Sequence, residues 1–393
     1  MMVIGLTVGT RNNFGLFLKP ITGELGWNRE LFSLAVATQN LVWGISQPFT
    51  GAIADRYGSG RVVAATGVSY VAGLWLMAAA TQPWHLVVGM GLLIGLGTSG
   101  GFAVILGAVG RAFASKTRSR ALGLATAGGS VGWILVSGIS QWGIERYGWR
   151  STLELISLVV VMMVPLALLL RAPKNRNAHI IATNVEMSIG MAVKAATQHS
   201  GYRWLFLGFF VCGFHVVFIS SHLPSYLSDM GMPASAGAVA LALIGGFNLL
   251  GTTVAGELGG RWSQKTVLSG LYFLRAVFIT LFIALPLTQT TLVVFSVAMG
   301  LLWLGTVPLT SGLVAYMFGP RYLSTLFGII FLGHQLGSFS GVWLGGWLYD
   351  RTGTYREVWY AAIVLGLAAT VIHLMMSTEQ DTRLTQEPAT ETP

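Results

Sequence analysis

Apolar segments of about 20 residues recur along the whole chain, and this feature limits its fold more than any other. A segment of that length spans the hydrocarbon core of a bilayer as an α-helix. The sequence therefore predicts an all-α membrane protein with twelve transmembrane helices. The predicted spans are Met1–Gly23, Leu31–Ala54, Val62–Thr81, Trp84–Gly110, Ala121–Gly143, Thr152–Leu170, Trp204–Leu227, Ala234–Leu258, Val267–Pro286, Thr291–Phe318, Thr325–Leu348 and Val358–Met376.

Composition agrees with this class. Charged residues make up 9% of the 393 residues, against about 25% in a typical soluble domain. The 51 glycines suit helices that pack closely in a membrane. A single cysteine, Cys212, excludes an internal disulfide and a thiolate metal cluster. The net charge of +9 is scattered over short loops, so no nucleic-acid partner is expected, and no metal or cofactor site is predicted.

One long polar stretch divides the spans into two groups of six. We predict an N-terminal six-helix bundle over 1–170, a cytoplasmic linker over 171–203, a C-terminal six-helix bundle over 204–376 and a disordered cytoplasmic tail over 377–393. Most lysines and arginines fall on the loops that share a side with the N-terminus, which predicts that both termini are cytoplasmic. No cleavable signal peptide is expected. The first span begins without a polar lead, so we expect the natural start to lie upstream.

An internal repeat supports the division into halves. The segments Gly51–Arg61 and Gly256–Thr266 match at an offset of 205 residues, and each follows the second span of its half. Parallel six-helix repeats about an axis along the membrane normal are a known transporter architecture. The first segment resembles the loop signature of the major facilitator superfamily. Its matching residues are Gly51, Asp55, Arg56, Gly58 and Arg61.

The resemblance implies that this loop acts as a conformational latch. In that reading Gly51 lets two helices approach closely, Asp55 faces a helix N-terminus, and the arginines anchor at the headgroups. The sequence departs from the family pattern at Gly60, where an arginine is common, and at Gly260, which replaces the aspartate in the second half.

Further segments resemble the monocarboxylate-carrier branch of that superfamily and its bacterial relatives. They are Gly15–Ile21, Gly26–Arg29, Phe331–Gly337 and Gly345–Tyr355. The resemblance implies transport of a small monocarboxylate, often with a proton. A functional lysine of the animal members falls near Asn12, beside Arg11. In the eighth helix, Asn248 and Thr252 stand where lactate-type carriers have an acid or amide and an arginine, so the arginine is missing.

Two arginines lie inside apolar segments, where a charge is costly and marks a functional candidate. Arg11 is in the first span and Arg275 in the ninth. No carboxylate lies at mid-membrane depth, which suggests that the partner anion is the substrate. An arginine binds a carboxylate through two parallel hydrogen bonds. Arg275 could instead be structural and reach Glu257.

Histidines and amides complete the candidate site. His215 and His222 lie seven residues apart in the seventh span, and His334 lies midway along the eleventh. They could carry a coupled proton or form hydrogen bonds between helices. Polar residues on pore-facing helices can orient a ligand or join helices, and tryptophans can line a cavity. These residues are Asn12, Asn13, Gln39, Asn40, Asn248, Tyr316, Trp43, Trp133 and Trp303.

The sequence thus predicts a monomeric secondary active transporter in the inner membrane, which moves a small organic anion by alternating access with proton symport. The predicted substrate-binding residues are Arg11, Asn12, Gln39, Asn248, His215, Tyr316, His334 and Arg275. An efflux antiporter for amphipathic metabolites or drugs is the alternative, although such sites often carry an embedded acid. An enzyme is not expected, because no paired acids, metal cluster or activated nucleophile lie at one depth. A sensor would need an added soluble domain.

Overall fold

The computed structural model describes residues 1–112, 115–170, 189–319 and 322–381, and within these ranges the side chains of Asp55, Ala103, 110–123 and Ile189 are not described. Every regular element in the described ranges is helical. The first half contains α1 (Met2–Asn12), η1 (Phe14–Phe17), α2 (Leu18–Leu25), α3 (Arg29–Tyr57), α4 (Ser59–Ala78), α5 (Pro83–Leu86), η2 (Val87–Ile94), α6 (Gly95–Gly101), α7 (Ala103–Ala112), α8 (Ser115–Val160) and α9 (Met163–Leu168).

The second half repeats this plan. It contains α11 (Ser200–Asp229), α12 (Ser235–Arg261), α13 (Gln264–Ala284), α14 (Gln289–Leu302), α15 (Thr306–Phe318), α16 (Leu323–Thr352) and α17 (Arg356–Met375). A short helix, α10 (Ile189–Gln198), lies within the predicted linker, whose first eighteen residues, 171–188, fall outside the described ranges. The predicted disordered tail falls outside them from residue 382 onward.

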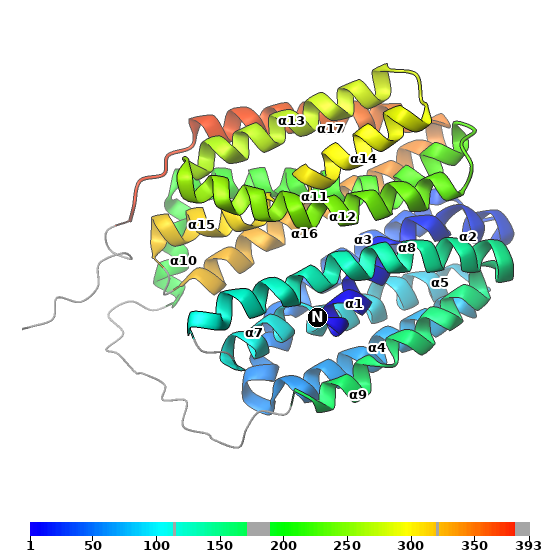
Figure 1. The fold of residues 1–393 in the computed structure, drawn as a ribbon, viewed down its shortest axis with the longest axis horizontal. Helices are drawn as coiled ribbons and strands as arrows, with labels where there is room; N and C mark the ends of the chain where they lie inside the picture. The colour runs from blue at the N-terminus through cyan, green and yellow to red at the C-terminus, as the bar shows by residue number, and fades with distance from the viewer. Residues whose placement is uncertain (113–114, 171–188, 320–321, 382–393) are drawn as a thin grey trace, which may run out of the picture.

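The helices account for the predicted membrane passes. In the described ranges, nine helices are long and apolar enough to cross a membrane. One of them, Leu124–Leu168, makes two passes, because the chain reverses direction at Gly148, whose φ of 77° favours glycine (Figure 1). The segments Met2–Leu25 and Arg29–Tyr57, both richer in polar residues, complete the twelve.

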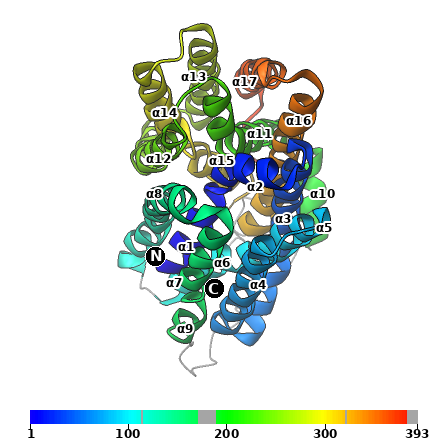
Figure 2. The same ribbon diagram turned by 90° about the vertical axis from the view of Figure 1, so that its right-hand side faces the viewer.

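The two halves lie side by side as separate groups of roughly parallel and antiparallel helices. Figures 1 and 2 show α1 to α9 on one side of the molecule and α11 to α17 on the other. Contacts between the halves come chiefly from α16 against α3 and from α12 against α8. These four helices therefore form the interface where a ligand could lie between the halves.

The first pass is not a continuous α-helix. It breaks after α1, at Asn13, and continues as the 3-10 turn η1 and then α2. Pro20 has no backbone N–H, so the normal α-helical bond to the carbonyl four residues earlier cannot form. The side chain of Asn13 donates to the carbonyls of Gly9 and Trp133 and accepts from Ser137. The break is thus satisfied internally, and it leaves Arg11 in the last turn of α1.

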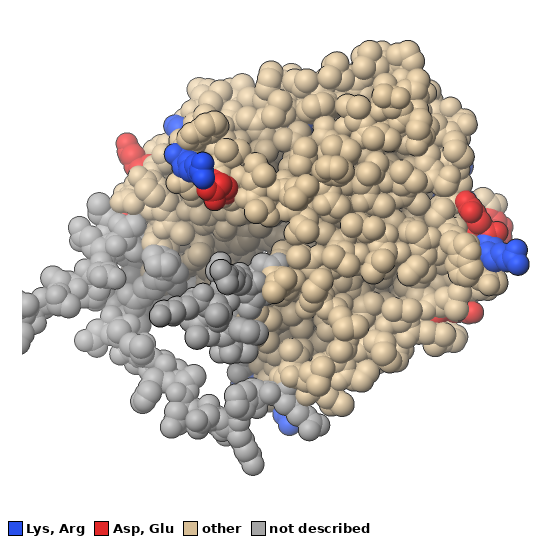
Figure 3. Space-filling model, in the orientation of Figure 1, with Lys and Arg blue, Asp and Glu red and all other residues tan. Residues whose placement is uncertain are grey.

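The molecule has two ends, and Figure 3 shows charged residues at these ends with a wide uncharged band between them. We call the end that holds Gly26–Arg29, Asp229 and Asp350–Tyr355 the locked end. We call the opposite end, which holds Tyr57–Arg61 and Arg261–Gln264, the motif end, because the repeated loop segments lie there. An uncharged band between charged ends is the pattern of a membrane-embedded surface.

The halves pack tightly toward the locked end. A side chain at Gly346 of α16 would meet the backbone of Arg29 and the side chain of Ser33 in α3. At the motif end, Gly51, Gly256 and Gly328 have nothing among the described residues within 4 Å of the place where a Cβ would lie. No described residue approaches Gly51 of α3 closely in this conformation, so its expected role in bringing two helices together stays a prediction.

Candidate functional site

Arg11 lies at the interface between the halves, in the last turn of α1. Its guanidinium donates to Oδ1 of Asn12 at 3.1 Å and to Oδ1 of Asn40 in α3. It also lies over the ring of Trp43, 4.6 Å from the ring centroid. Its Nε is buried and has no hydrogen-bond partner in the described part of the chain. Uncharged groups therefore hold this cation and leave a donor free.

The second half supplies the facing side of the site from α16. Gln335 donates from Nε2 to the backbone carbonyl of Asn40 at 3.0 Å, which joins the two halves beside Arg11. Gly44 makes room for Gln335, because a Cβ there would lie 2.7 Å from its Cγ. Replacing Gly44 with any larger residue would push α16 away from α3.

Aromatic rings extend this junction to a histidine. Phe331 packs edge-on against Trp43 with centroids 5.4 Å apart and stacks on His334 at 5.6 Å. Nδ1 of His334 lies 3.0 Å from Oε1 of Gln335. A continuous chain of contacts thus runs from Arg11 in one half, through Trp43 and Phe331, to His334 in the other. We call Arg11, Asn40, Trp43, Phe331, His334 and Gln335 the central cluster.

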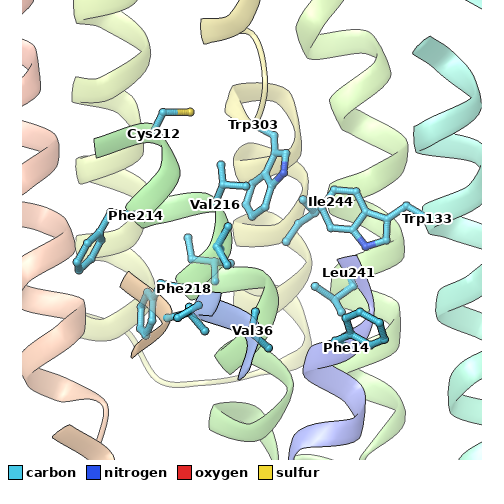
Figure 4. Packing of buried hydrophobic residues seen from close by; sticks show 14 of the residues in the cluster. Phe14, Val36, Trp133, Cys212, Phe214, Val216, Phe218, Leu241, Ile244 and Trp303 are labelled. Atoms are coloured by element: carbon cyan, nitrogen blue, oxygen red, sulfur yellow. The ribbon is translucent and has the colours of Figure 1, made fainter. Parts of the chain in front are cut away.

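Asn248 lies at a second contact between the halves. Its Nδ2 donates to Oγ of Ser130 in α8 at 3.2 Å, and its Oδ1 accepts from the backbone N–H of Leu304 at 3.1 Å. Beside it, Trp133 of α8 and Trp303 of the second half lie 5.6 Å apart, and Figure 4 shows their rings turned toward each other. The side-chain amide of Asn248 thus joins the two halves and fixes the loop after α14.

Arg275 has a different environment from Arg11. It is completely buried, and it donates to the carbonyls of Leu302 and Trp303, where α14 ends and the chain breaks before α15. Carbonyls at a helix C-terminus have no intrahelical partner and attract a cation. The suggested contact with Glu257 is wrong, because that carboxylate pairs with Arg261 at 2.6 Å.

Three other predicted substrate-binding residues form no side-chain hydrogen bond or ring contact with the central cluster in the described part of the chain. His215 bonds through Nε2 to the carbonyl of Ala362 in α17 at 2.8 Å, so it lies inside the second half. Tyr316 is 53% exposed. Gln39 is completely buried, and its amide has no partner in the described part of the chain. It lies on α3 one turn before Trp43.

In the described part of the chain no group of three potential metal ligands occurs, around the histidine pair of the seventh span or elsewhere. His222 lies near the locked end, and its Nδ1 is 3.1 Å from the hydroxyl of Tyr355. Its Nε2 is 2.9 Å from the carbonyl of Val342. This histidine joins α11 to α16 and to the start of α17.

An ion-pair network at the locked end was not predicted. Arg29 of α3 binds Asp229 of α11 through two hydrogen bonds of 2.6 and 2.9 Å, and Lys19 approaches the same carboxylate at 3.0 Å. Arg29 also donates to the hydroxyl of Tyr355 and lies over the ring of Tyr349, 3.6 Å from its centroid. All these contacts cross from the first half to the second.

A carboxylate of α16 also caps α3 across the same interface. Asp350 accepts from the backbone N–H of Arg29 at 3.1 Å and of Glu30 at 2.6 Å. A negative charge at a helix N-terminus is favourable, because the first N–H groups have no partner within the helix. The segments Gly26–Arg29 and Gly345–Tyr355 drew attention in the sequence, but their spacing could not show that they meet.

The latch residues lie at the motif end, between α3 and α4. Gly58 has a φ of 96°, which allows the sharp turn between these helices. The guanidinium of Arg56 lies 5.3 Å from the ring of Tyr57, and Arg61 is exposed. The side chain of Asp55 falls outside the described residues, so its expected contact with a helix N-terminus stays a prediction.

Comparisons with known proteins agree on one family. The family model described as Major Facilitator Superfamily matches residues 1–256 and 247–392. An "Uncharacterized MFS-type transporter YcxA" of Bacillus subtilis is 27% identical over 92% of this chain and 90% of its own length. Monocarboxylate transporter 13 of Rattus norvegicus is 25% identical over 91% of this chain and 82% of its own.

Solved structures show the same fold. A bacterial homologue of the human lysosomal transporter Spinster, in an inward-facing and unoccupied conformation, superposes with a TM-score of 0.78 over 98% of this chain and 97% of that one. The nucleoside transporter NupG superposes with a TM-score of 0.74 over 95% of this chain and 99% of that one. Their sequence identities of 14% and 13% support a shared fold only.

Proposed function

Because the chain belongs to the Major Facilitator Superfamily, and so is a multi-pass membrane transporter, we propose that it moves a small organic anion, most simply a monocarboxylate, by alternating access. The observation that carries this proposal is Arg11. Its cation lies between the halves and has only neutral partners in the described part of the chain, with Nε unpaired. A substrate carboxylate would accept charge-assisted hydrogen bonds from the guanidinium of Arg11.

The low-identity resemblance to monocarboxylate transporters supports the same substrate class. The described aspartates and glutamates lie near helix ends or in the tail, so none competes with a substrate for Arg11. An antiporter for cationic drugs would be expected to hold an acid in this position. Asn40 and Trp43 fix the guanidinium from one half, and Phe331, His334 and Gln335 would close around the ligand from the other.

The packing of the two ends supports alternating access. The ion pairs of Arg29 and Asp229 join the halves at the locked end, whereas Gly51, Gly256 and Gly328 toward the motif end have no close neighbour in the described part of the chain. We propose that the motif end faces the cytoplasm, with both termini on that side and the protein in the inner membrane. The structure would then correspond to an inward-open state, with the central cluster reached from the motif end.

We further propose that a proton accompanies the anion and that His334 binds it. His334 is the ionisable residue that the second half contributes to the central cluster, and it is 5% exposed, with its ring between Phe331 and Phe209. Oε1 of Gln335 can only accept, so Nδ1 of His334 carries a hydrogen in this contact and the coupled proton would bind at Nε2. A positive ring would strengthen the bond to Gln335, whose Nε2 donates to the carbonyl of Asn40, and this links the proton to that contact. The coupling would therefore act on the junction between the halves.

Uptake assays with purified protein in liposomes test both the anion substrate and the coupled proton. A panel of C2 to C6 monocarboxylates is offered with and without an inward proton gradient. We expect Arg11→Gln to abolish uptake, while Arg356→Gln, at an exposed arginine of α17, behaves as wild type. His334→Gln should keep exchange of anion but lose acceleration by the gradient. Normal uptake by Arg11→Gln would contradict the substrate assignment.

A further inference from the structure

A groove lies on the outer wall of the first half, away from the interface with the second. It has a volume of about 510 Å³. Its lining comes from α4 and from both arms of α8: Trp75, Trp142, Tyr147, Ser151, Glu154, Leu155 and Leu158. Figure 2 shows α4 and the following arm of α8 on the side of the bundle opposite to the second half. The groove therefore opens toward lipid and not toward the transport path.

The groove lies at the depth of the membrane interface near the locked end. Trp75 is three residues from the end of α4, and Glu154 is six residues beyond the reversal at Gly148. At a rise of about 1.5 Å per residue, both are within about 10 Å of the ends of their helices. Tryptophan and tyrosine concentrate at this depth because their rings are apolar and their tips are polar.

A carboxylate without a partner lies inside this apolar groove. Glu154 is exposed, and its side chain has no hydrogen bond or ion pair in the described part of the chain. The nearest cation along the helix, Arg150, is turned away and binds Glu24 and the carbonyls of Ala78 and Ala80. A carboxylate at the interface with no partner in the described part of the chain is free to pair with a cation from outside the protein.

The aromatic residues around Glu154 suit an ammonium group. Trp142 and Tyr147 pack edge-to-face with centroids 5.3 Å apart, and both are more than half exposed. Trp75 is 50% exposed on the facing helix. A ring face attracts a cation, and several rings beside a carboxylate make a site for an organic ammonium. The groove thus offers an anion and exposed ring surfaces together.

We propose that this groove binds a phospholipid with a primary ammonium headgroup. The ammonium would donate N–H groups to Glu154, which a quaternary headgroup cannot do. Leu158 lies one turn farther along the same face as Glu154, toward the bilayer centre, and would contact an acyl chain. Arg146 lies one turn beyond Trp142, is exposed and has no partner in the described part of the chain, and would take the phosphate.

Native mass spectrometry of the full chain in mild detergent tests the proposal. Phosphatidylethanolamine, phosphatidylcholine and phosphatidylglycerol with identical acyl chains are added in turn. We expect wild type to retain phosphatidylethanolamine about tenfold more than either of the others, which corresponds to about one hydrogen bond to a charged group. Glu154→Gln should lose that preference. Glu145→Gln, at an exposed acid of the same helix outside the groove, should keep it.

A second variant distinguishes a loss of lipid preference from a folding defect. Trp142→Leu keeps an apolar lining and removes a ring, and we expect it to reduce the preference for phosphatidylethanolamine without changing the total lipid retained. Equal retention of phosphatidylethanolamine by wild type and Glu154→Gln would overturn the proposal. A preference for phosphatidylcholine or phosphatidylglycerol would also overturn it, as would binding of dodecylammonium without any binding of phosphatidylethanolamine.

Discussion

Arg11 covers the ring of Trp43 at 4.6 Å, so a helix of the first half presents its cation to an aromatic residue that itself touches the second half. The ring holds the guanidinium without neutralising it, because a cation–π contact supplies no counter-charge. An anion that binds Arg11 would therefore act at the point where the halves meet. On the proposed function, this is how the central cluster would respond to a ligand.

Replacing Asn40 with Asp should abolish anion uptake. The new carboxylate would pair with Arg11 in place of the amide oxygen and compete with the substrate from inside the protein. Asn40→Ala removes one hydrogen bond to a charged group, so we expect KM to rise about tenfold, equivalent to about 1.5 kcal/mol. Initial rates of uptake into liposomes separate the two variants. Unimpaired uptake by Asn40→Asp would show that Arg11 does not bind the substrate.

Removing the carboxylate of Asp229 should open the locked end. Arg29 and Lys19 would lose their shared partner. A hydrogen bond to a charged group contributes about 1.5–3 kcal/mol, so the state with separated helices should gain at least about tenfold in population. Spin labels at Met230 and Thr81, in a background with Cys212→Ser, report the distance between halves. Glu257→Gln breaks an exposed pair within one helix and should leave that distance unchanged.

Substitutions of Asp350 should weaken the contact between the halves at the locked end, because this residue caps the N-terminus of α3. Asp350→Ala leaves the N–H groups of Arg29 and Glu30 without a partner, at a cost of about 0.5–2 kcal/mol. Asp350→Asn keeps one acceptor oxygen, so it should lose less stability than Asp350→Ala. Thermal unfolding in detergent measures both variants. Equal melting temperatures for wild type and Asp350→Ala would mean that the cap contributes nothing to this state.

Arg275 is expected to affect stability and not substrate affinity. Arg275→Gln leaves buried carbonyls of Leu302 and Trp303 without a donor, which costs about 1–3 kcal/mol for each unsatisfied group. Arg275→Lys should rescue little, because an ammonium lacks the planar fork that reaches both carbonyls. We expect a lower melting temperature with an unchanged KM in the folded fraction. A raised KM at normal stability would place Arg275 at the substrate instead.

The sequence was sufficient to predict the family and the helical fold, because span length and the repeated loop are local signals. The residues that contact Arg11 were harder to predict from the sequence. Asn40 and Trp43 stood out as polar and aromatic residues on the second span, but periodicity alone does not say which face of a helix meets the other half. The same ambiguity placed His215 among the substrate residues, whereas its side chain turns toward Ala362 in α17.

The locked end was missed for a related reason. Lys19, Arg29, Asp229 and Asp350 lie in or beside short loops that are far apart in the sequence, where charges are usually solvated. Only the packing of α3 against α16 and of η1 against α11 brings these charges together. Residue type was visible at each position, but the pairing depends on tertiary structure.

The proposed pairing of Arg11 with a substrate carboxylate can be tested directly by titration calorimetry. Propionate and its neutral isostere propionamide are each titrated into wild type and into Arg11→Gln. Two charge-assisted hydrogen bonds predict that wild type binds propionate at least about tenfold more tightly than propionamide, and that Arg11→Gln binds both equally weakly. A variant that keeps the full preference for propionate would contradict the account, because the charge would then be recognised elsewhere.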